Sequence, residues 1–205
     1  MGLTAEQIKA GIDAVCGVEP KFARALDHAG YPEPRSRARG YTTLLRTIVG
    51  QQISVAAAAS VWGKLEAALG PGCPAEAVVA SDFAALRACG LSAQKQGYAR
   101  SLAELTLTGG LPLDDLPADD EAAIALLTQV KGIGRWSAEI YLLFAEGRAD
   151  IWPAGDLAVQ EAVKRILGLP ERPAEKATRL LADPWRPHRG PIAILSWHCY
   201  NIEAI

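Results

Sequence analysis

Signals for the start and the end of α-helices follow one another along almost the whole chain, and they constrain its fold more than any other feature. Thr4-Ala-Glu-Gln7 has the pattern of a capping box that opens a first helix. Pro20 suits the first turn of a second helix, and Gly30 suits its end. Further helices are expected in segments bounded by Ser, Asp, Gly or Pro: 41–49, 54–69, 81–90, 92–107, 119–130, 135–146, 156–168, 174–182 and 187–202.

A β-sheet is not expected, because no segment shows a convincing alternation of polar and apolar residues. Strand-forming residues gather only at Val78-Val79 and at 150–152. The pattern therefore predicts an all-α protein of roughly ten helices with short connections.

Composition narrows the class of protein. Half of the 205 residues are hydrophobic, as in ordinary globular proteins, and no apolar run is long enough to cross a bilayer. No secretory signal is recognisable, so we expect an intracellular, cytoplasmic protein. The cysteines are widely separated, which argues against a zinc site or an iron–sulfur cluster, and we expect them to be reduced and buried: Cys16, Cys73, Cys89 and Cys199.

The net charge of −2 argues against a protein that covers nucleic acid with its whole surface. It leaves room for a local basic face. One short basic run contains Arg35, Arg37 and Arg39, and another contains Arg186 and Arg189. Such runs suit contacts with phosphates but also suit a plain solvated surface, and the sequence favours neither.

The five residues Val130-Lys-Gly-Ile-Gly134 join two of the predicted helices. The glycines Gly132 and Gly134 allow a tight turn and a close approach to a ligand. Arg135 begins the next helix, whose N–H groups and dipole attract an anion such as a phosphate, and Lys131 adds a positive charge. Taken alone, the pattern is more typical of a plain turn between two helices.

Several segments, in the same order along the chain, resemble motifs of one family. Residues 130–139 resemble the hairpin signature of the helix-hairpin-helix (HhH-GPD) DNA glycosylase superfamily, and Pro153–Asp156 resembles its loop that ends in the catalytic aspartate. Residues 48–54 resemble a motif in its other lobe. Residues 183–187, followed by 196–198, resemble the C-terminal motif of the 3-methyladenine DNA glycosylase II branch.

The resemblance implies a two-lobed helical bundle with a helix-hairpin-helix motif and a cleft between the lobes. One lobe is expected at about 30–115, and the lobe with the hairpin is expected at 1–30 plus 116–205. Some members of the branch carry an extra N-terminal α/β domain. Because the residues before about 40 suggest helices, the chain resembles the compact form of the family.

Asp156 stands at the predicted start of a helix, where aspartate is a preferred N-cap residue, so a structural role alone would explain it. The resemblance gives this position the catalytic carboxylate. Breaking an N-glycosidic bond develops positive charge on the sugar, and a fixed carboxylate stabilises that charge and can orient or deprotonate the attacking water. We favour the catalytic role, with which the cap is compatible.

The resemblance also implies the reaction and the substrate class. Relatives that also cut the DNA strand carry a lysine where this chain has Trp136, so a monofunctional hydrolase without lyase activity is expected. Trp136 and Trp197 match positions that line the base pocket, where an indole suits a cationic alkylated purine such as 3-methyladenine or 7-methylguanine. Ile140 stands where relatives have a further pocket aromatic, whereas Trp62 and Trp185 are expected in the core.

Two further roles follow from the resemblance. The segment Gln51-Gln52 matches the part that fills the gap left by a flipped nucleotide, with Gln52 as the first wedge candidate and Gln51 as the second. The family hairpin also binds a monovalent cation, Na⁺ or K⁺, through backbone carbonyls. By position these carbonyls belong to Thr128, Val130 and Ile133, and no other cofactor is expected.

The expected partner is double-stranded DNA with damaged bases, bound by a monomer that is associated with the nucleoid only through DNA and not with a membrane. One alternative is an HhH glycosylase for other damaged or mismatched bases. A second is a non-catalytic HhH DNA-binding protein, which the presence of Asp156 disfavours. A third is a protein-interaction domain, which leaves Trp136, Asp156 and Trp197 unexplained as a set.

Overall fold

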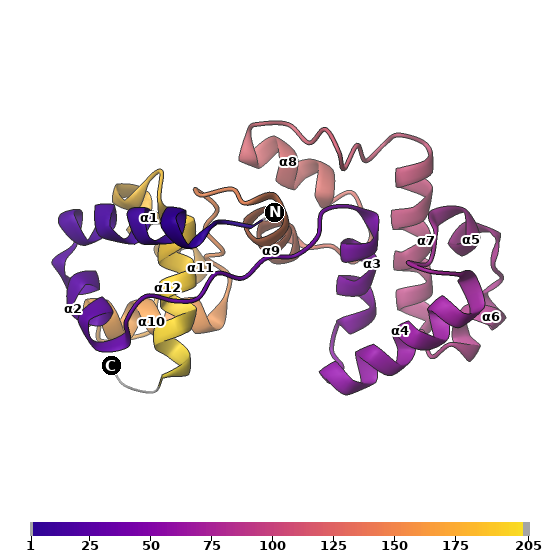
Figure 1. Ribbon diagram of the computed structural model, residues 1–205, viewed down its shortest axis with the longest axis horizontal. Helices are drawn as coiled ribbons and strands as arrows, with labels where there is room; N and C mark the ends of the chain where they lie inside the picture. The colour runs from indigo at the N-terminus through magenta and orange to yellow at the C-terminus, as the bar shows by residue number, and fades with distance from the viewer. Residues whose placement is uncertain (1, 203–205) are drawn as a thin grey trace. The chain divides into compact units, whose positions relative to one another are not determined.

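The structure is a computed structural model that describes residues 2–202, and within this part it contains helices and no β-strand (Figure 1). The prediction of an all-α fold is confirmed. No helix of the described part is long and apolar enough to cross a membrane. The α-helices are α1 (Ala5–Val18), α2 (Pro20–Ala29), α3 (Tyr41–Gly50), α4 (Val55–Leu69), α5 (Ala75–Ala80), α6 (Phe83–Ala88), α7 (Ala93–Leu107), α8 (Asp120–Leu127), α9 (Arg135–Tyr141), α10 (Leu157–Leu167), α11 (Glu175–Leu181) and α12 (Arg189–Asn201).

Side-chain caps explain most helix starts. Thr4 and Gln7 form the predicted capping box at α1, and Glu19 caps α2 ahead of Pro20. Ser54 and Ser92 accept backbone N–H groups at the starts of α4 and α7, as the sequence predicts. These elements are therefore specified by local sequence.

The prediction of a helix at 81–90 that Ser81 opens is wrong at its start. Ser81 does not open a helix but ends α5, and Asp82 caps α6 by accepting the N–H of Ala85 at 2.7 Å. Val78 and Val79, where strand-forming residues gather, lie inside α5, which packs on α7 and buries Val78. Tertiary packing here overrides the strand propensity of valine.

The helix predicted at 135–146 also differs. It is α-helical only as far as Tyr141 and continues as a π-helix, η1 (Leu142–Glu146), which Gly147 closes with a φ of 72°. Short π-helical stretches occur often at functional sites. A 3₁₀-helix, η2 (Asp183–Trp185), precedes α12.

The described residues divide into two compact units, unit 1 with residues 2–37 and 139–202, and unit 2 with Ala38–Ala138. This division differs from the one drawn from the sequence, because the hairpin at 130–134 falls in unit 2. Two hydrogen bonds hold the hairpin in unit 2. The N–H of Lys131 donates to Ser101 Oγ of α7 at 3.2 Å, and the side-chain amide of Gln51 donates to the Gly132 carbonyl at 2.8 Å.

Unit 1 is built around α12, which packs on α1 and on α10, and α2 packs against all three (Figure 1). Trp185 lies in its core, with the ring of Phe22 at 4.9 Å and the ring of Trp152 at 5.4 Å, both edge to face. The prediction of a core role for Trp185 is confirmed.

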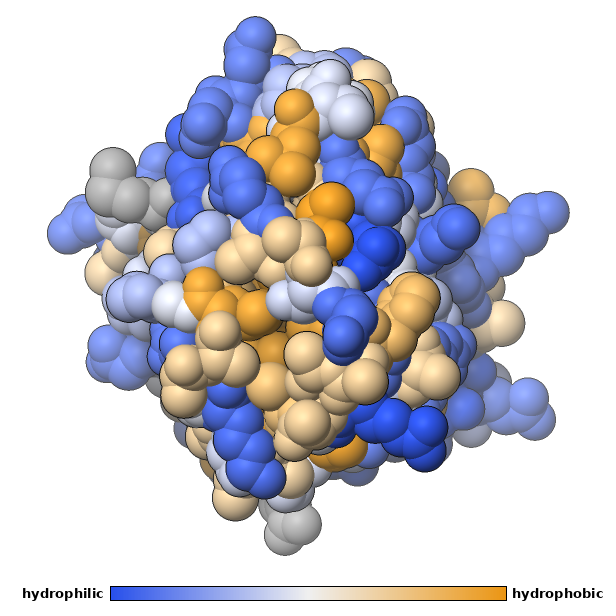
Figure 2. Space-filling view, turned by 90° about the vertical axis from the view of Figure 1, so that its right-hand side faces the viewer, coloured by the Kyte–Doolittle hydropathy of each residue, from blue (hydrophilic) through white to orange (hydrophobic). Residues whose placement is uncertain are grey.

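Unit 2 is built around α7, which packs on α3, α5 and α6. Trp62 is buried under the guanidinium of Arg46, as expected for a core residue. The space-filling view shows apolar side chains interspersed with hydrophilic ones on the face of the molecule that is turned to the viewer (Figure 2). Phe83, at the start of α6, is half exposed.

Candidate active site

Asp156 begins α10 and is half-buried. Its Oδ1 atom accepts the backbone N–H groups of Ala158 at 2.9 Å and of Val159 at 3.0 Å. The predicted N-cap is therefore present, and it fixes the carboxylate at the positive end of the helix dipole.

Trp197, from α12, is the second member of the site. Its indole Nε1–H donates to the same Asp156 oxygen at 3.1 Å, so a third donor converges on Oδ1. The structure thus brings Asp156 and Trp197 together within unit 1.

Phe144 is a member of the site that the sequence did not reveal. Its ring lies 5.6 Å from the ring of Trp197, tilted by 35°, and its backbone belongs to the π-helix η1. The carbonyl of Phe144 also accepts the N–H of Arg37 at 2.8 Å. Phe144 follows Ile140 by four residues, and this helical spacing is the signal that could have placed it on the side of the predicted pocket residue.

The loop that ends in Asp156 is held by hydrogen bonds and burial. Trp152 donates its indole N–H to the Thr178 carbonyl at 3.0 Å, and Gln160 donates its side-chain amide to the Ala154 carbonyl at 2.8 Å. The N–H of Asp156 itself donates to the Pro153 carbonyl at 2.9 Å. The position of the carboxylate is therefore determined by a rigid support rather than by a mobile loop.

The hairpin lies in unit 2, where its two glycines have different requirements. Gly132 has a φ of 86°, and a Cβ at this position would lie 2.1 Å from the Tyr98 ring, so only glycine fits. A Cβ on Gly134 would meet no atom of the described protein within 4 Å, and its φ is not in the left-handed region. The fold therefore requires Gly132, whereas the surface beside Gly134 stays open to a ligand.

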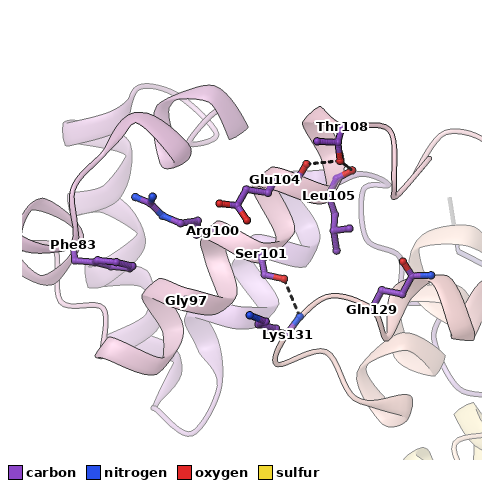
Figure 3. Close-up of a pocket in the computed structure, with 9 residues that line it drawn as sticks. All are labelled: Phe83, Gly97, Arg100, Ser101, Glu104, Leu105, Thr108, Gln129 and Lys131. Carbon is purple, nitrogen blue, oxygen red and sulfur yellow. Dashed lines mark hydrogen bonds between the residues drawn. The ribbon is translucent and has the colours of Figure 1, made fainter.

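A hollow of about 440 Å³ lies beside the hairpin on α7 (Figure 3). Figure 3 shows Ser101 in this hollow accepting the N–H of Lys131, whose side chain is exposed. Arg100 stacks its guanidinium on the Phe83 ring at 4.9 Å, while Glu104 adds a negative charge. The remaining lining residues are Gly97, Leu105, Thr108 and Gln129.

The two wedge candidates occupy the turn between α3 and α4. Gln51 binds the Gly132 carbonyl and so connects this turn with the hairpin inside unit 2. Gln52 is exposed and has a φ of 56°, a conformation that is strained for a residue with a side chain. Gln51 is therefore held by a hydrogen bond within unit 2, whereas Gln52 is exposed at the surface.

The remaining predicted residues have varied surroundings. Arg135 forms an ion pair with Glu121. Trp136 belongs to unit 2 and is 47% exposed, which suits a contact surface, whereas Ile140 is buried in unit 1. The expectation of solvated or phosphate-binding charge fails for Arg189, because its guanidinium is buried and paired with Asp150 at 2.8 Å.

The three residues predicted to hold a cation lie at the hairpin. Thr128 ends α8, and the Val130 carbonyl accepts the N–H of Ile133 at 3.0 Å within the turn. Their carbonyl oxygens are hard donors that suit an alkali cation. Elsewhere in the described part, no group of three His, Cys, Asp or Glu residues is placed to hold a metal ion.

Comparisons with known proteins identify the family of the chain. The HhH-GPD superfamily of base excision DNA repair proteins matches residues 45–187, and the chain belongs to this superfamily. DNA-3-methyladenine glycosylase 1 of Schizosaccharomyces pombe is 29% identical over 188 residues, which cover 88% of this chain and 82% of that protein.

Two solved structures are similar over nearly the whole chain. The S. pombe 3-methyladenine DNA glycosylase in complex with abasic DNA has a TM-score of 0.77 at 29% identity and covers 92% of this chain and 95% of its own. A DNA-3-methyladenine glycosidase from Bacillus halodurans has a TM-score of 0.84 at 26% identity. The match covers 93% of this chain and 88% of the glycosidase chain. Both support the fold described above.

Proposed function

We propose that the chain is a monofunctional DNA glycosylase of base excision repair that removes alkylated bases, 3-methyladenine among them, by hydrolysis. One observation carries the proposal: the Asp156 carboxylate is held by the α10 N-cap and by the indole of Trp197. The similar proteins named as 3-methyladenine glycosylases support the substrate class.

The chemistry follows from a fixed negative charge. Alkylation makes the purine cationic and a good leaving group, so the bond to the sugar breaks with little acid catalysis. Asp156 then stabilises the positive charge on the sugar and orients the water that attacks it. Trp136 occupies the position where a lysine would form a Schiff base, so the product is an intact abasic site without strand cleavage.

Substrate selection is assigned to aromatic faces. Trp197, supported by Phe144, presents an electron-rich ring beside the carboxylate, and Trp136 supplies a second indole. Stacking and cation–π attraction favour a charged base over a neutral one. Because 7-methylguanine carries the same positive charge as 3-methyladenine, we include it among the substrates.

Engagement with double-stranded DNA is assigned to unit 2. Lys131, Gly132, Gly134 and Arg135 contact phosphates, because a glycine turn that leads into the start of a helix binds the DNA backbone without reading sequence. Gln52, with Gln51 beside it, fills the gap when the damaged base flips out. The protein acts as a monomer in the cytoplasm and reaches the nucleoid through DNA alone.

A monovalent cation at the carbonyls of Thr128, Val130 and Ile133 would stabilise the hairpin by neutralising oxygen dipoles. Thermal unfolding in Na⁺ or K⁺, against a bulky organic cation at equal ionic strength, tests this part. Equal melting temperatures would remove the cation from the proposal.

The decisive assay uses duplex DNA treated with a methylating agent. Incubation should release 3-methyladenine and 7-methylguanine and leave abasic sites that break on heating but not before. The Asp156→Asn variant should bind the same DNA and release almost nothing. A wild-type protein that releases no alkylated base would refute the proposed function, and strand breaks without heating would refute the absence of lyase activity.

A further inference from the structure

The helix α11 touches the loop that carries Asp156 through one of its faces. Glu175, Thr178 and Arg179 are spaced by three and four residues, so they share that face. The Thr178 carbonyl accepts the indole N–H of Trp152, and an Arg179 Nη1–H donates to the Trp152 carbonyl at 3.4 Å. α11 therefore holds Trp152 at both its side chain and its backbone.

Arg179 also joins this loop to α9. Its Nη1 atom lies 3.2 Å from Oε1 of Glu139, a carboxylate that is only 2% exposed, and its Nη2 atom lies 3.0 Å from Oε1 of Glu175. A buried carboxylate requires a partner, and the planar fork of a guanidinium can serve several acceptors at once. Arg179 thus links a buried charge, a surface charge and a loop carbonyl.

Glu175 completes the contact with the loop. A Cβ added to Gly155 would lie 3.3 Å from its Oε2 atom, so this carboxylate rests directly against the residue before Asp156. The ion pair with Arg179 places Glu175 in that position. Arg179 therefore fixes the loop at two points. It binds the Trp152 carbonyl directly and holds Glu175 against Gly155.

We infer that Arg179 is a positioning residue for Asp156, acting through the loop 152–155 without touching the DNA. The inference rests on the proposed function, since it assigns Asp156 the central role. A catalytic group displaced by about 1 Å can lose roughly a hundredfold in rate. Hydrogen bonds within the loop and to α10 set its shape, and α11 adds the contacts at Trp152 and Gly155 that hold the loop against unit 1.

The test compares Arg179→Lys and Arg179→Met with Arg165→Met. Lysine keeps a positive charge for the buried Glu139 but loses the planar fork, so this variant stays folded. Arg165 forms an ion pair of the same spacing with Glu161 but makes no described contact with the loop, so its removal is the matched control. Both arms use the intact chain.

Two readouts are taken from each variant. Single-turnover base release at saturating protein should fall about 10- to 100-fold in both Arg179 variants, while the Kd for DNA stays within about twofold. Hydrogen exchange at the amides of Ala158 and Val159, which bind Asp156, should speed up. The Arg165 variant should match the wild type in both.

An Arg179→Lys variant with wild-type release rates, or with unchanged amide protection, overturns the positioning role. The positioning role is also overturned if the Arg179 variants bind DNA more weakly but release bases at the wild-type rate. If the wild type releases no base at all, the proposed function fails. The exchange measurement then still decides whether Arg179 holds the loop.

Discussion

The indole N–H of Trp197 donates a hydrogen bond to Oδ1 of Asp156 at 3.1 Å, and this bond connects α12 with the N-cap residue of α10. Two backbone N–H groups of α10 bind the same oxygen. The carboxylate therefore has a defined orientation next to an aromatic ring. A fixed negative charge suits a developing sugar cation, and the neighbouring π face suits a cationic base.

Trp197→Phe should separate these two contributions, because phenylalanine keeps a ring beside Phe144 and removes the indole N–H. A hydrogen bond to a charged group contributes about 1.5–3 kcal/mol, and part of this is expected in the transition state. We expect base release to fall roughly tenfold while DNA affinity changes little. Single-turnover kinetics with methylated duplex measure the first and a binding titration the second.

Trp62→Phe is the matched control, since Trp62 is buried in unit 2 and its indole nitrogen has no hydrogen-bond partner among residues 2–202. It should leave base release unchanged. If Trp197→Phe also released bases at the wild-type rate, the bond to Asp156 would have no catalytic importance.

Substitutions of Asp156 should separate its capping from its chemistry. Serine and asparagine are good N-caps, so both variants should unfold within about 0.5 kcal/mol of the wild type, whereas alanine should lose about 1 kcal/mol. All three should be nearly inactive, because none supplies a negative charge. Denaturant unfolding and the release assay check this, and an active Asp156→Ser variant would show that capping suffices.

The hairpin offers a pair of glycine variants with opposite expectations. Gly132→Ala places a Cβ against Tyr98 at a φ of 86° and should destabilise the protein by about 2–4 kcal/mol. Gly134→Ala meets no protein atom within 4 Å and should leave stability unchanged. It should nevertheless weaken DNA binding several-fold, because a methyl group would stand between the hairpin and a phosphate.

Thermal unfolding and DNA titration at one salt concentration measure the pair. The hairpin would have no role in DNA binding if Gly134→Ala bound as tightly as the wild type. Tyr98→Ala should relieve part of the damage in Gly132→Ala, which provides an internal check on the steric cause.

The parts of the fold that were predictable from the sequence are those with local causes. Thr4, Ser54 and Ser92 cap helices through atoms within three residues, so the pattern alone reveals them. The N-cap position of Asp156 was also predictable, because the loop before it and the helix after it are contiguous in the chain.

The parts that were missed depend on contacts between distant residues. Arg189 looks like surface charge in the sequence, but it pairs with Asp150, 39 residues away. The spacing from Ile140 can place Phe144 on one side of a helix, but the contact of its ring with Trp197 joins residues far apart in the chain. Glu139 has its partner 40 residues away in Arg179, and no local pattern announces such a pair.

The surface cluster of Lys9, Asp13 and Tyr31 should make stability depend on pH. The Lys9 ammonium and the Tyr31 hydroxyl both donate to the Asp13 carboxylate, and they hold its pKa below the ordinary value of an aspartate. A lowered folded-state pKa stabilises the protein above about pH 4 and loses that effect as the pH falls through the folded value. Because the cluster is half exposed, we expect at most about 1 kcal/mol.

Asp13→Asn should therefore be less stable than the wild type at pH 6, with the difference shrinking as the pH falls below about 4 and through the lowered folded-state pKa. Urea unfolding at a series of pH values measures the difference. Asp27→Asn, at an exposed position of α2, is the control and should show no such convergence. A gap between Asp13→Asn and the wild type that widened on acidification would contradict the assigned sign.

The turn between α3 and α4 should show different roles for its two glutamines. Gln51→Ala removes the bond to the Gly132 carbonyl and should reduce stability by about 1 kcal/mol. Gln52→Gly relieves a φ of 56° and should leave stability equal or slightly higher. Its effect should appear in function, because base flipping costs a few kcal/mol that a wedge helps to offset.

Base release from duplex and from single-stranded methylated DNA decides the role of Gln52. A single strand has no stack to open, so Gln52→Gly should lower release from duplex roughly tenfold and leave release from the single strand unchanged. An equal fall on both substrates would mean that Gln52 acts on the chemical step or on binding in general. Because the glycine variant removes backbone strain, a specific loss on duplex cannot be attributed to unfolding of the turn.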